Sequence, residues 1–264
     1  MCLIVFAWQA HPRYPLVLAA NRDEYFSRPT RALHYWDDLP NVLGGRDLEK
    51  GGGWCAAHTD GRWAAVTNFR DGAAPQLSAP SRGDLVRNYM ASDKRAREYV
   101  DQVIGTLTDY PGCNLLVGDD RALYFVTNRA QGINRAQARP VRAGLHGLSN
   151  DSLDTPWPKV ERSKSRMERM LASQPDQLID ALFDILADRS TADEDALPST
   201  GIPIEWEKRL SAPFIVAGDY GTRASTVMVV ANDGEVSVQE RTFGSGGVEL
   251  TRRAFSFGTA TVTR

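Results

Sequence analysis

The sequence contains little cysteine and histidine, and neither residue is arranged to bind a metal ion. The three cysteines, Cys2, Cys55 and Cys113, form no CxxC pair, and no two of the four histidines stand at ligand spacing. We therefore expect no metal site. An odd number of cysteines without a signal peptide is typical of a reducing compartment, so we also expect a cytoplasmic protein.

Long apolar runs and an excess of one charge are missing as well. The apolar segment at residues 3–8 has no basic residues before it and is too short for a signal peptide or a membrane span. The 31 basic and 33 acidic residues are well mixed and give a net charge of −2, which argues against nucleic acid as a partner. No internal repeat is visible, and we interpret residues 1–264 as a single domain.

What is present is a succession of short strands and helix pairs. Apolar runs and turn signals predict strands at residues 2–8, 15–20, 54–58, 62–69, 114–117, 123–127, 145–148, 225–231 and 236–241. Helices are predicted at residues 84–90, 94–107, 158–171 and 175–188, and the polar stretch 189–211 is predicted to be a mobile loop. Strands joined by tight turns pair antiparallel. The pattern therefore predicts an α+β fold, a four-layer αββα sandwich of two antiparallel sheets.

Cys2 is the first candidate for chemistry. Methionine before a small residue is commonly removed, and removal of Met1 would leave Cys2 with a free α-amine. Reference pKa values are about 8 for such an amine and about 8.5 for the thiol, so the amine can take the proton that activates the sulfur. The alternative is that Cys2 is an ordinary buried strand residue with a structural role.

The predicted first hairpin brings a polar cluster beside Cys2. A turn centred between His11 and Pro12 pairs residues whose numbers sum to 23, which places Cys2 opposite Asn21. The register therefore predicts that the run from Asn21 to Glu24 lies at the start of the first strand.

This run, Asn21, Arg22, Asp23 and Glu24, combines a hydrogen-bond donor, a cation and two anions. Asp23 can hold a protonated α-amine, and Arg22 can lower the pKa of a thiol or bind an anionic group. The alternative is a polar turn that closes a strand, with a surface ion pair that contributes little.

Further candidates stand at the ends of later strands. A turn at Asp60-Gly61 would place Asn68 opposite Gly53, and the amides of Asn68 and Asn150 are candidate donors to an oxyanion. Arg223 is a candidate to orient a nucleophile or bind a carboxylate, and the glycine run at residues 51–53 allows close backbone approach to a ligand. The alternatives are strand-ending asparagines, a solvated arginine and a flexible entry into a strand.

The order of several motifs resembles a known family. The segments MCLIVFAW, LVLAANRDEYFSRPT, LGGRDLEKGGGWCAA, WAAVTNFR, RGDLV, NLLVGD, GLSNDSLDTPWPKV and YGTRASTVMVV follow one another over residues 1–245. Together they resemble the NRDE family, also called the Transport and Golgi organisation protein 2 family, which takes its name from the run at residues 21–24.

The resemblance implies an N-terminal-nucleophile (Ntn) hydrolase-like αββα fold, in agreement with the strand pattern. It also implies a distant similarity to the choloylglycine hydrolase and penicillin V acylase group. Matched by motif, the catalytic residues of that group would be Cys2, Arg22, Asp23, Asn68, Asn150 and Arg223. One departure is that Arg22 and Asp23 are adjacent here, whereas the group separates this arginine and aspartate by two residues. Neighbours in a strand face opposite ways.

Two functions follow from the resemblance, since members of the family have been linked to haem trafficking and to acyl-CoA and lipid metabolism. The first is an amidase or acyl-CoA thioesterase that needs no cofactor and uses Cys2 as nucleophile. The second is a carrier for haem or an acyl-CoA-like ligand, held in the same pocket by Asn21, Arg22, Asp23 and Glu24. A third interpretation leaves Cys2 with a structural role only.

Overall fold

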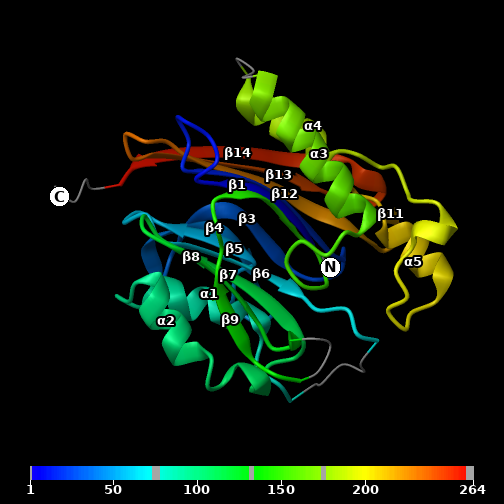
Figure 1. The fold of residues 1–264 in the computed structure, drawn as a ribbon, viewed down its shortest axis with the longest axis horizontal. Coiled ribbons are helices and arrows are strands. Elements are labelled where there is room, and N and C mark those ends of the chain that lie inside the picture. Colours follow the sequence, from blue (N-terminus) through cyan, green and yellow to red (C-terminus); the bar gives the residue numbers. More distant parts are fainter. Residues whose placement is uncertain (1, 73–77, 131–133, 174–176, 260–264) are drawn as a thin grey trace.

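The computed structural model describes residues 2–72, 78–130, 134–173 and 177–259. Over these residues the chain forms two antiparallel sheets and five α-helices. The sheets face one another, with one group of helices outside each of them, as Figure 1 shows. The predicted α+β fold with four αββα layers is therefore confirmed.

Sheet A holds both ends of the described chain. Its strand order is β10 (Gly144–Leu148), β1 (Cys2–Trp8), β2 (Leu16–Tyr25), β12 (Tyr220–Val230), β13 (Glu235–Phe243) and β14 (Glu249–Gly258), with β11 (Val216–Ala217) paired to β12. Since β1 lies between β10 and β2, the strand that begins with Cys2 is an interior strand of this sheet.

Sheet B is formed by the middle of the chain, with its strands in sequence order. They are β3 (Thr30–Trp36), β4 (Leu39–Asp47), β5 (Cys55–His58), β6 (Trp63–Asn68), β7 (Cys113–Gly118), β8 (Leu123–Thr127) and β9 (Gln137–Pro140). Each strand pairs antiparallel with the next, so sheet B is a continuous meander.

The helices are α1 (Arg82–Ala91), α2 (Ala96–Val103), α3 (Pro158–Ser173), α4 (Leu178–Leu186) and α5 (Ile204–Leu210), with short 3₁₀ turns at Leu107–Asp109, Glu194–Ala196 and Ser245–Gly247. The start of α1 is set by Ser81, whose side chain accepts a hydrogen bond from the Gly83 N–H at 3.2 Å. This cap fixes the position of Arg82, the first residue of α1.

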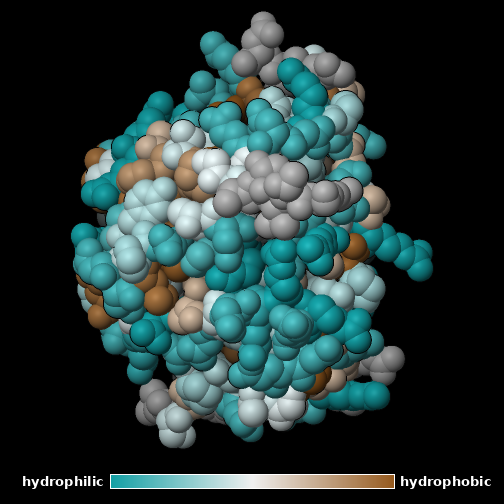
Figure 2. All heavy atoms as spheres, turned by 90° about the vertical axis from the view of Figure 1, so that its left-hand side faces the viewer, coloured by the Kyte–Doolittle hydropathy of each residue, from teal (hydrophilic) through white to brown (hydrophobic). Residues whose placement is uncertain are grey.

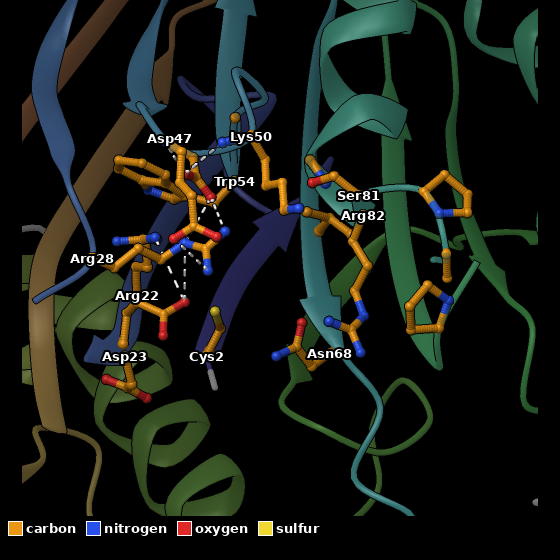
Figure 3. A pocket seen from close by; sticks show the side chains of 18 residues that line it. Cys2, Arg22, Asp23, Arg28, Asp47, Lys50, Trp54, Asn68, Ser81 and Arg82 are labelled. Carbon is orange, nitrogen blue, oxygen red and sulfur yellow. Dashed lines mark hydrogen bonds and ion pairs between the residues drawn. The ribbon is translucent and has the colours of Figure 1, made fainter. Parts of the chain in front are cut away.

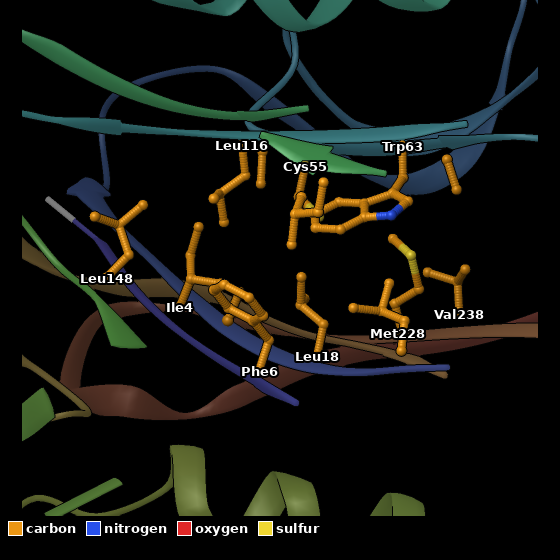
Figure 4. Close-up of a cluster of buried hydrophobic side chains, with 14 of the residues drawn as sticks. Ile4, Phe6, Leu18, Cys55, Trp63, Leu116, Leu148, Met228 and Val238 are labelled. Carbon is orange, nitrogen blue, oxygen red and sulfur yellow. The ribbon is translucent and has the colours of Figure 1, made fainter. Parts of the chain in front are cut away.

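The alternation of side chains along β1 builds two of the three apolar layers. Ile4 and Phe6 face sheet B, where they share a core with Trp63 and Leu116 (Figure 4). Val5 faces the opposite way and packs with residues of α3 and α4. A third layer joins sheet B to α1 and α2. The outer surface at one end of the sandwich is mainly hydrophilic, with scattered apolar patches (Figure 2).

The predicted first hairpin forms, with its register shifted by one residue from the predicted pairing. β1 pairs Cys2 with Arg22, so the numbers of paired residues sum to 24. The Gln9 N–H donates to the Pro15 carbonyl at 2.8 Å, and Gln9 adopts a left-handed φ of 48°. The turn is therefore centred on Pro12 itself rather than between His11 and Pro12.

The predicted pairing of Asn68 with Gly53 is wrong. β5 begins at Cys55, which pairs with Ala65, and the last residue of β6, Asn68, pairs with Cys113 of β7. The glycine run instead lies against α1, because a Cβ on Gly52 would stand 2.5 Å from the backbone of Gly83. A side chain at Gly52 would push the start of α1 outward.

Several elements were not predicted. Strands β3, β4, β9, β11 and β14 are additional to the predicted set, and α5 forms inside the stretch that was predicted to be a loop. The four predicted helices are present with different bounds, and the start of the one predicted at residues 175–188 lies outside the described residues.

Candidate functional site

A cavity of about 360 Å³ opens where the first residues of β1 approach the end of β6 and the start of α1. We call it the Cys2 pocket. Of the predicted site residues, Cys2, Arg22, Asp23, Glu24 and Asn68 line it, together with Arg28 and Arg82, which were not predicted. Figure 3 shows Cys2 and Arg22 on one wall and Asn68 and Arg82 on the other. The fold thus brings together residues that are up to 80 positions apart in the sequence.

The half-buried Cys2 side chain points into this pocket (Figure 3). Burial raises the pKa of the Cys2 thiol, while Arg22 and a hydrogen bond from the Asp23 backbone act in the opposite direction. Because burial dominates, the thiol is protonated at neutral pH, and a nucleophilic role requires a base that removes its proton.

Arg22 lies beside Cys2 and is held on three sides. Its guanidinium stacks over the ring of Trp54 at 4.4 Å, and its Nη1 donates to Thr30 Oγ1 at 3.2 Å. Glu24 lies 3.7 Å from its Nη2. These contacts fix a cation at the mouth of the pocket, and Trp54 provides a flat apolar wall behind it.

Asp23 points to the other face of β2, as expected for the neighbour of Arg22 in a strand. Its Oδ1 accepts a hydrogen bond from Thr222 Oγ1 at 2.7 Å, and its carbonyl accepts one from the Tyr220 hydroxyl at 3.1 Å. Burial raises the pKa of the Asp23 carboxyl, and the charge of Lys159 opposes that rise. Asp23 still lines the pocket, so both faces of β2 contribute to the site.

Glu24 and Arg28 belong to a network of charges at the rim. Glu24 lies 3.9 Å from Arg28 Nε, and Arg28 also pairs with Asp47 at 2.8 Å and with Glu49 at 3.5 Å. The cations Arg22 and Arg28 are therefore neutralised by carboxylates of the same pocket.

Asn68 and Asn150 are in direct contact but play different parts. The side chain of Asn68 lines the pocket, whereas Asn150 is fully buried and does not. Asn150 Nδ2 donates to the Asn68 carbonyl at 2.9 Å, and the Asn150 carbonyl accepts from the Arg70 N–H at 2.7 Å. Asn150 thus holds the chain at the end of β6, where Asn68 turns toward Cys2.

Arg223 and Asn21 lie outside the Cys2 pocket and make framework contacts. Arg223 Nη1 donates to the carbonyls of Tyr25 and Arg28, both at 2.8 Å, and so fixes the turn after β2. Asn21 Nδ2 donates to the carbonyls of Leu186 and Pro213 at 2.9 and 2.8 Å. These contacts anchor β2, which carries Arg22 and Asp23.

A buried charged cluster behind the pocket was not predicted. Arg70 Nη1 pairs with Glu207 of α5 at 2.5 Å, and the Arg70 guanidinium stacks over Trp157 at 4.7 Å. Lys159, in the first turn of α3, is fully buried, and its Nζ has no hydrogen-bond partner among the described residues. Burial lowers the pKa of Lys159 to about 8, while Asp23 acts to raise it. The segment Trp157-Pro158-Lys159 was the one sequence signal for this cluster.

Arg82 provides a cation on the wall across from Cys2. Its Nε donates to the Gly112 carbonyl at 2.9 Å, and no carboxylate in the described part of the chain lies within ion-pair distance of its guanidinium. Burial lowers the pKa of the Arg82 guanidinium, and Cys113, Asp71 and Cys2 act against that effect. Arg82 therefore differs from Arg22 and Arg28 in making no ion pair within the described residues, although the charge of Asp71 favours its charged form.

The described residues offer no metal site and no helix long and apolar enough to cross a membrane. Within them, no group of three or more histidine, cysteine or acidic residues is arranged to hold a metal ion. None of the helices in the described ranges is long and apolar enough to cross a membrane.

Comparison with known proteins identifies the family. The model of the family described as "Transport and Golgi organisation 2" matches residues 1–245. The chain therefore belongs to the Transport and Golgi organisation 2 family. The resemblance inferred from the motifs is thus confirmed.

Relatives in the Transport and Golgi organisation 2 family match over nearly their whole length. The Transport and Golgi organization protein 2 homologs of Bos taurus and Homo sapiens are 35% and 33% identical over 269 residues. In both comparisons the match covers 91% of this chain and 92% of the relative. The Drosophila melanogaster protein is 25% identical over 266 residues, with 92% of each chain covered.

Solved structures with a similar fold are Ntn hydrolases. The Caenorhabditis elegans ortholog of N-acylethanolamine-hydrolyzing acid amidase matches with a TM-score of 0.52 and 9% identity, covering 86% of this chain and 92% of its own. A conjugated bile acid hydrolase from Clostridium perfringens matches with a TM-score of 0.52 and 10% identity, and the match covers 97% of this chain and 92% of the hydrolase. At such identities the similarity shows the fold alone, and the expected Ntn-hydrolase-like fold is confirmed.

Proposed function

We propose that this protein is an N-terminal-cysteine hydrolase that cleaves an acyl amide or an acyl thioester. The observation that carries the proposal is the position of Cys2, which points into a cavity opposite Asn68 and beside Arg22 and Asp23. The proposal requires removal of Met1, because the α-amine of Cys2 then supplies the base that the protonated thiol needs.

The reaction begins with attack by sulfur. As the Cys2 sulfur bonds to the acyl carbon, the α-amine takes the thiol proton. The carbonyl oxygen becomes an oxyanion, and the side-chain amide of Asn68 is the pocket group suited to donate to it. The bond to the leaving nitrogen or sulfur then breaks, and the leaving group takes the proton from the ammonium.

Hydrolysis of the resulting thioester completes the cycle. Water gives a proton to the α-amine as its oxygen bonds to the acyl carbon, and the bond from that carbon to the Cys2 sulfur breaks. The sulfur regains its proton and the acid is released. We assign to Asp23 the role of neutralising the ammonium form of the amine in both halves of the reaction, because its buried carboxylate gains from a nearby positive charge.

The names of two similar folds support this choice of reaction. One is called an acid amidase that hydrolyses N-acylethanolamines, and the other a conjugated bile acid hydrolase. Within the same fold, a hydrolytic site at the first residue of the interior strand is consistent with those activities.

The test combines measurement of the intact mass of the protein with trapping of a covalent acyl adduct on Cys2. Intact mass of the protein from its native host should show loss of Met1 with an unblocked Cys2. Incubation with medium-chain acyl amides and acyl thioesters should yield a covalent acyl adduct on Cys2 and release of the acid. Cys2→Ala should abolish both. Retained or acetylated Met1 together with unchanged turnover in Cys2→Ala would overturn the proposal.

A second candidate function is binding and transfer of an anionic ligand such as an acyl-CoA or haem. The four cations that line the pocket, Arg22, Arg28, Lys50 and Arg82, favour it because they can pair with carboxylates or phosphates. Under this function Cys2→Ala should leave the affinity for CoA esters or haem nearly unchanged. Analysis of each ligand after incubation separates the two functions: a carrier returns the CoA ester intact, whereas the wild-type hydrolase releases the free acid and Cys2→Ala does not.

A further inference from the structure

Beside the Cys2 pocket lies a second cavity of very different character. It has a volume of about 320 Å³, and we call it the apolar pocket. Its wall is formed mainly by the side chains of Tyr25, Ile202, Pro203, Trp206, Leu210 and Tyr220. The Tyr220 ring makes edge contacts with Tyr25 at 5.1 Å and with Trp206 at 6.1 Å. Such a wall of rings and aliphatic groups suits a hydrocarbon chain.

The two pockets share wall residues next to the reactive sulfur. Asn68 and Glu24 line both of them, and Cys2 lines the first. A group that reacts with Cys2 and contacts Asn68 therefore has an apolar cavity on one side. Within the charged cavity, Arg82 lies beside Asn68 (Figure 3).

Two cations of this pocket, Lys50 and Arg82, make no ion pair among the described residues, and of the two Arg82 lies beside Asn68 (Figure 3). Glu24, Asp47 and Glu49 neutralise Arg22 and Arg28, whereas the Arg82 guanidinium uses only Nε, in its bond to Gly112, among the contacts of the described residues. A guanidinium with free N–H groups in a half-buried position matches a carboxylate or a phosphate.

We propose that the substrate is an amphipathic acyl compound whose apolar acyl chain occupies the apolar pocket and whose leaving group carries an anion bound by Arg82. The inference rests on the proposed hydrolase function and deepens it. The shared chemistry of the head group is a compact anion, and the experiment below separates a carboxylate from a phosphate.

The first experiment measures binding without turnover. Cys2→Ala is titrated calorimetrically with three amides that differ only in the head group: N-octanoylethanolamine, N-octanoylglycine and N-octanoyl-O-phosphoethanolamine. At least one anionic amide should bind tenfold to a hundredfold tighter than the neutral one, as expected for a hydrogen bond to a charged group. The tighter of the two anionic amides identifies the head group.

A second substitution tests whether Arg82 causes the tighter binding of the anionic amides. Adding Arg82→Met should remove the advantage of the anionic amides and leave binding of the neutral amide unchanged. Arg87→Met is the matched control, because Arg87 lies on the same helix, outside the pocket, and pairs with Asp38 at 3.2 Å. It should preserve the advantage. Equal affinity for all three amides, or an advantage that survives Arg82→Met, would overturn the inference.

The binding of the acyl chain in the apolar pocket is tested by varying the length of that chain in the ligand. Affinity should rise about threefold to fourfold for each methylene added from acetyl to octanoyl glycine, because each one is buried in the apolar pocket. Trp206→Ala should flatten this dependence, whereas Lys208→Ala, a change on the same helix outside the pocket lining, should not. A flat dependence in the wild type would contradict the assignment of the acyl chain. Because binding is measured in Cys2→Ala, absence of hydrolysis by the wild type would reject the hydrolase alone.

Discussion

Thr222 donates a hydrogen bond of 2.7 Å from its Oγ1 to Oδ1 of Asp23, across the pairing of β12 with β2. The same Oγ1 accepts the N–H of Ile215 at 2.9 Å. The register of β12 shifts between Thr222 and Ala224, and this bulge lets Thr222 face Asp23 while Arg223 reaches the turn after β2. One threonine thus links the carboxylate of the site to the segment before β12.

Thr222→Val should destabilise the protein by about 1–3 kcal/mol, because it leaves a buried N–H and a buried carboxylate without this partner. Urea denaturation measures the change. Thr242→Val is the control, since Thr242 pairs with Thr251 at an exposed position and should cost less than about 0.5 kcal/mol. Equal unfolding free energies for Thr222→Val and the wild type would show that the contact contributes nothing.

The buried ion pair between Arg70 and Glu207 should be far more sensitive to loss of one partner. Glu207→Gln should cost about 3–5 kcal/mol, because it leaves the buried guanidinium without its carboxylate. The double variant Arg70→Met with Glu207→Met should recover part of that loss, and a double-mutant cycle by urea denaturation measures the coupling. The exposed pair of Lys208 with Glu194 serves as comparison, where Glu194→Gln should cost at most about 1 kcal/mol.

Glu240 should make stability fall as the pH rises from about 4.5 to about 7. Its Oε1 accepts the Leu33 N–H at 2.7 Å between the sheets, and burial raises its pKa from 4.5 to about 7. The folded protein therefore holds this proton more tightly than the unfolded chain. The stabilisation is fully present below pH 4.5 and is lost as the pH passes 7, by roughly 3 kcal/mol.

Glu240→Gln should remove this slope, because the amide stays neutral and keeps both hydrogen-bond partners, Leu33 and Thr226. At pH 8 the variant should be more stable than the wild type, and near pH 4 the two should agree. Unfolding free energies at intervals between pH 4 and 8 check this, with the exposed Glu235→Gln as control. Parallel curves for wild type and Glu240→Gln would be the contrary result.

Lys159 should make the stability of the protein depend on pH in a more alkaline range than Glu240 does. Burial lowers its pKa from 10.5 to about 8, so between these values the unfolded chain binds the proton and the folded protein does not. Stability should rise as the pH increases from 8 to 10.5, and below pH 8 the buried charge costs roughly 3 kcal/mol. Lys159→Met should stabilise the protein at pH 7 and abolish the rise, whereas Lys164→Met on the same helix should not. A wild-type curve that is flat over this range would refute the assignment.

The sequence alone was sufficient to predict what depends on local pattern. The apolar runs of β1 and β2 and the short connection between them brought Cys2 close to Arg22, with an error of one residue. That error arose because Gln9 adopts a left-handed conformation that residue type does not favour. The alternation of β2 also correctly separated Arg22 from Asp23.

Features that depend on distant contacts could not be predicted. Strand β14 is exposed over most of its length and alternates only at its end, where Phe255 and Phe257 pack on the core. Helix α5 has seven residues and is stabilised by contacts such as that of Glu207 with Arg70. Arg82 reaches the site because Gly83, the next residue of α1, packs closely against Gly52 in the loop before β5. The roles of Asn150 and Lys159 likewise follow from tertiary packing, not from spacing along the chain.

The walls of the site belong to different sheets, since Cys2 begins an interior strand of sheet A while Asn68 ends a strand of sheet B. Between the sheets lies one thickness of interlocking side chains that includes Phe6 and Leu116. The bulk of these residues therefore sets the distance between Cys2 on sheet A and Asn68 on sheet B. In a relative with a thinner or thicker filling, the distance between these two walls would differ although every residue of its pocket stayed the same.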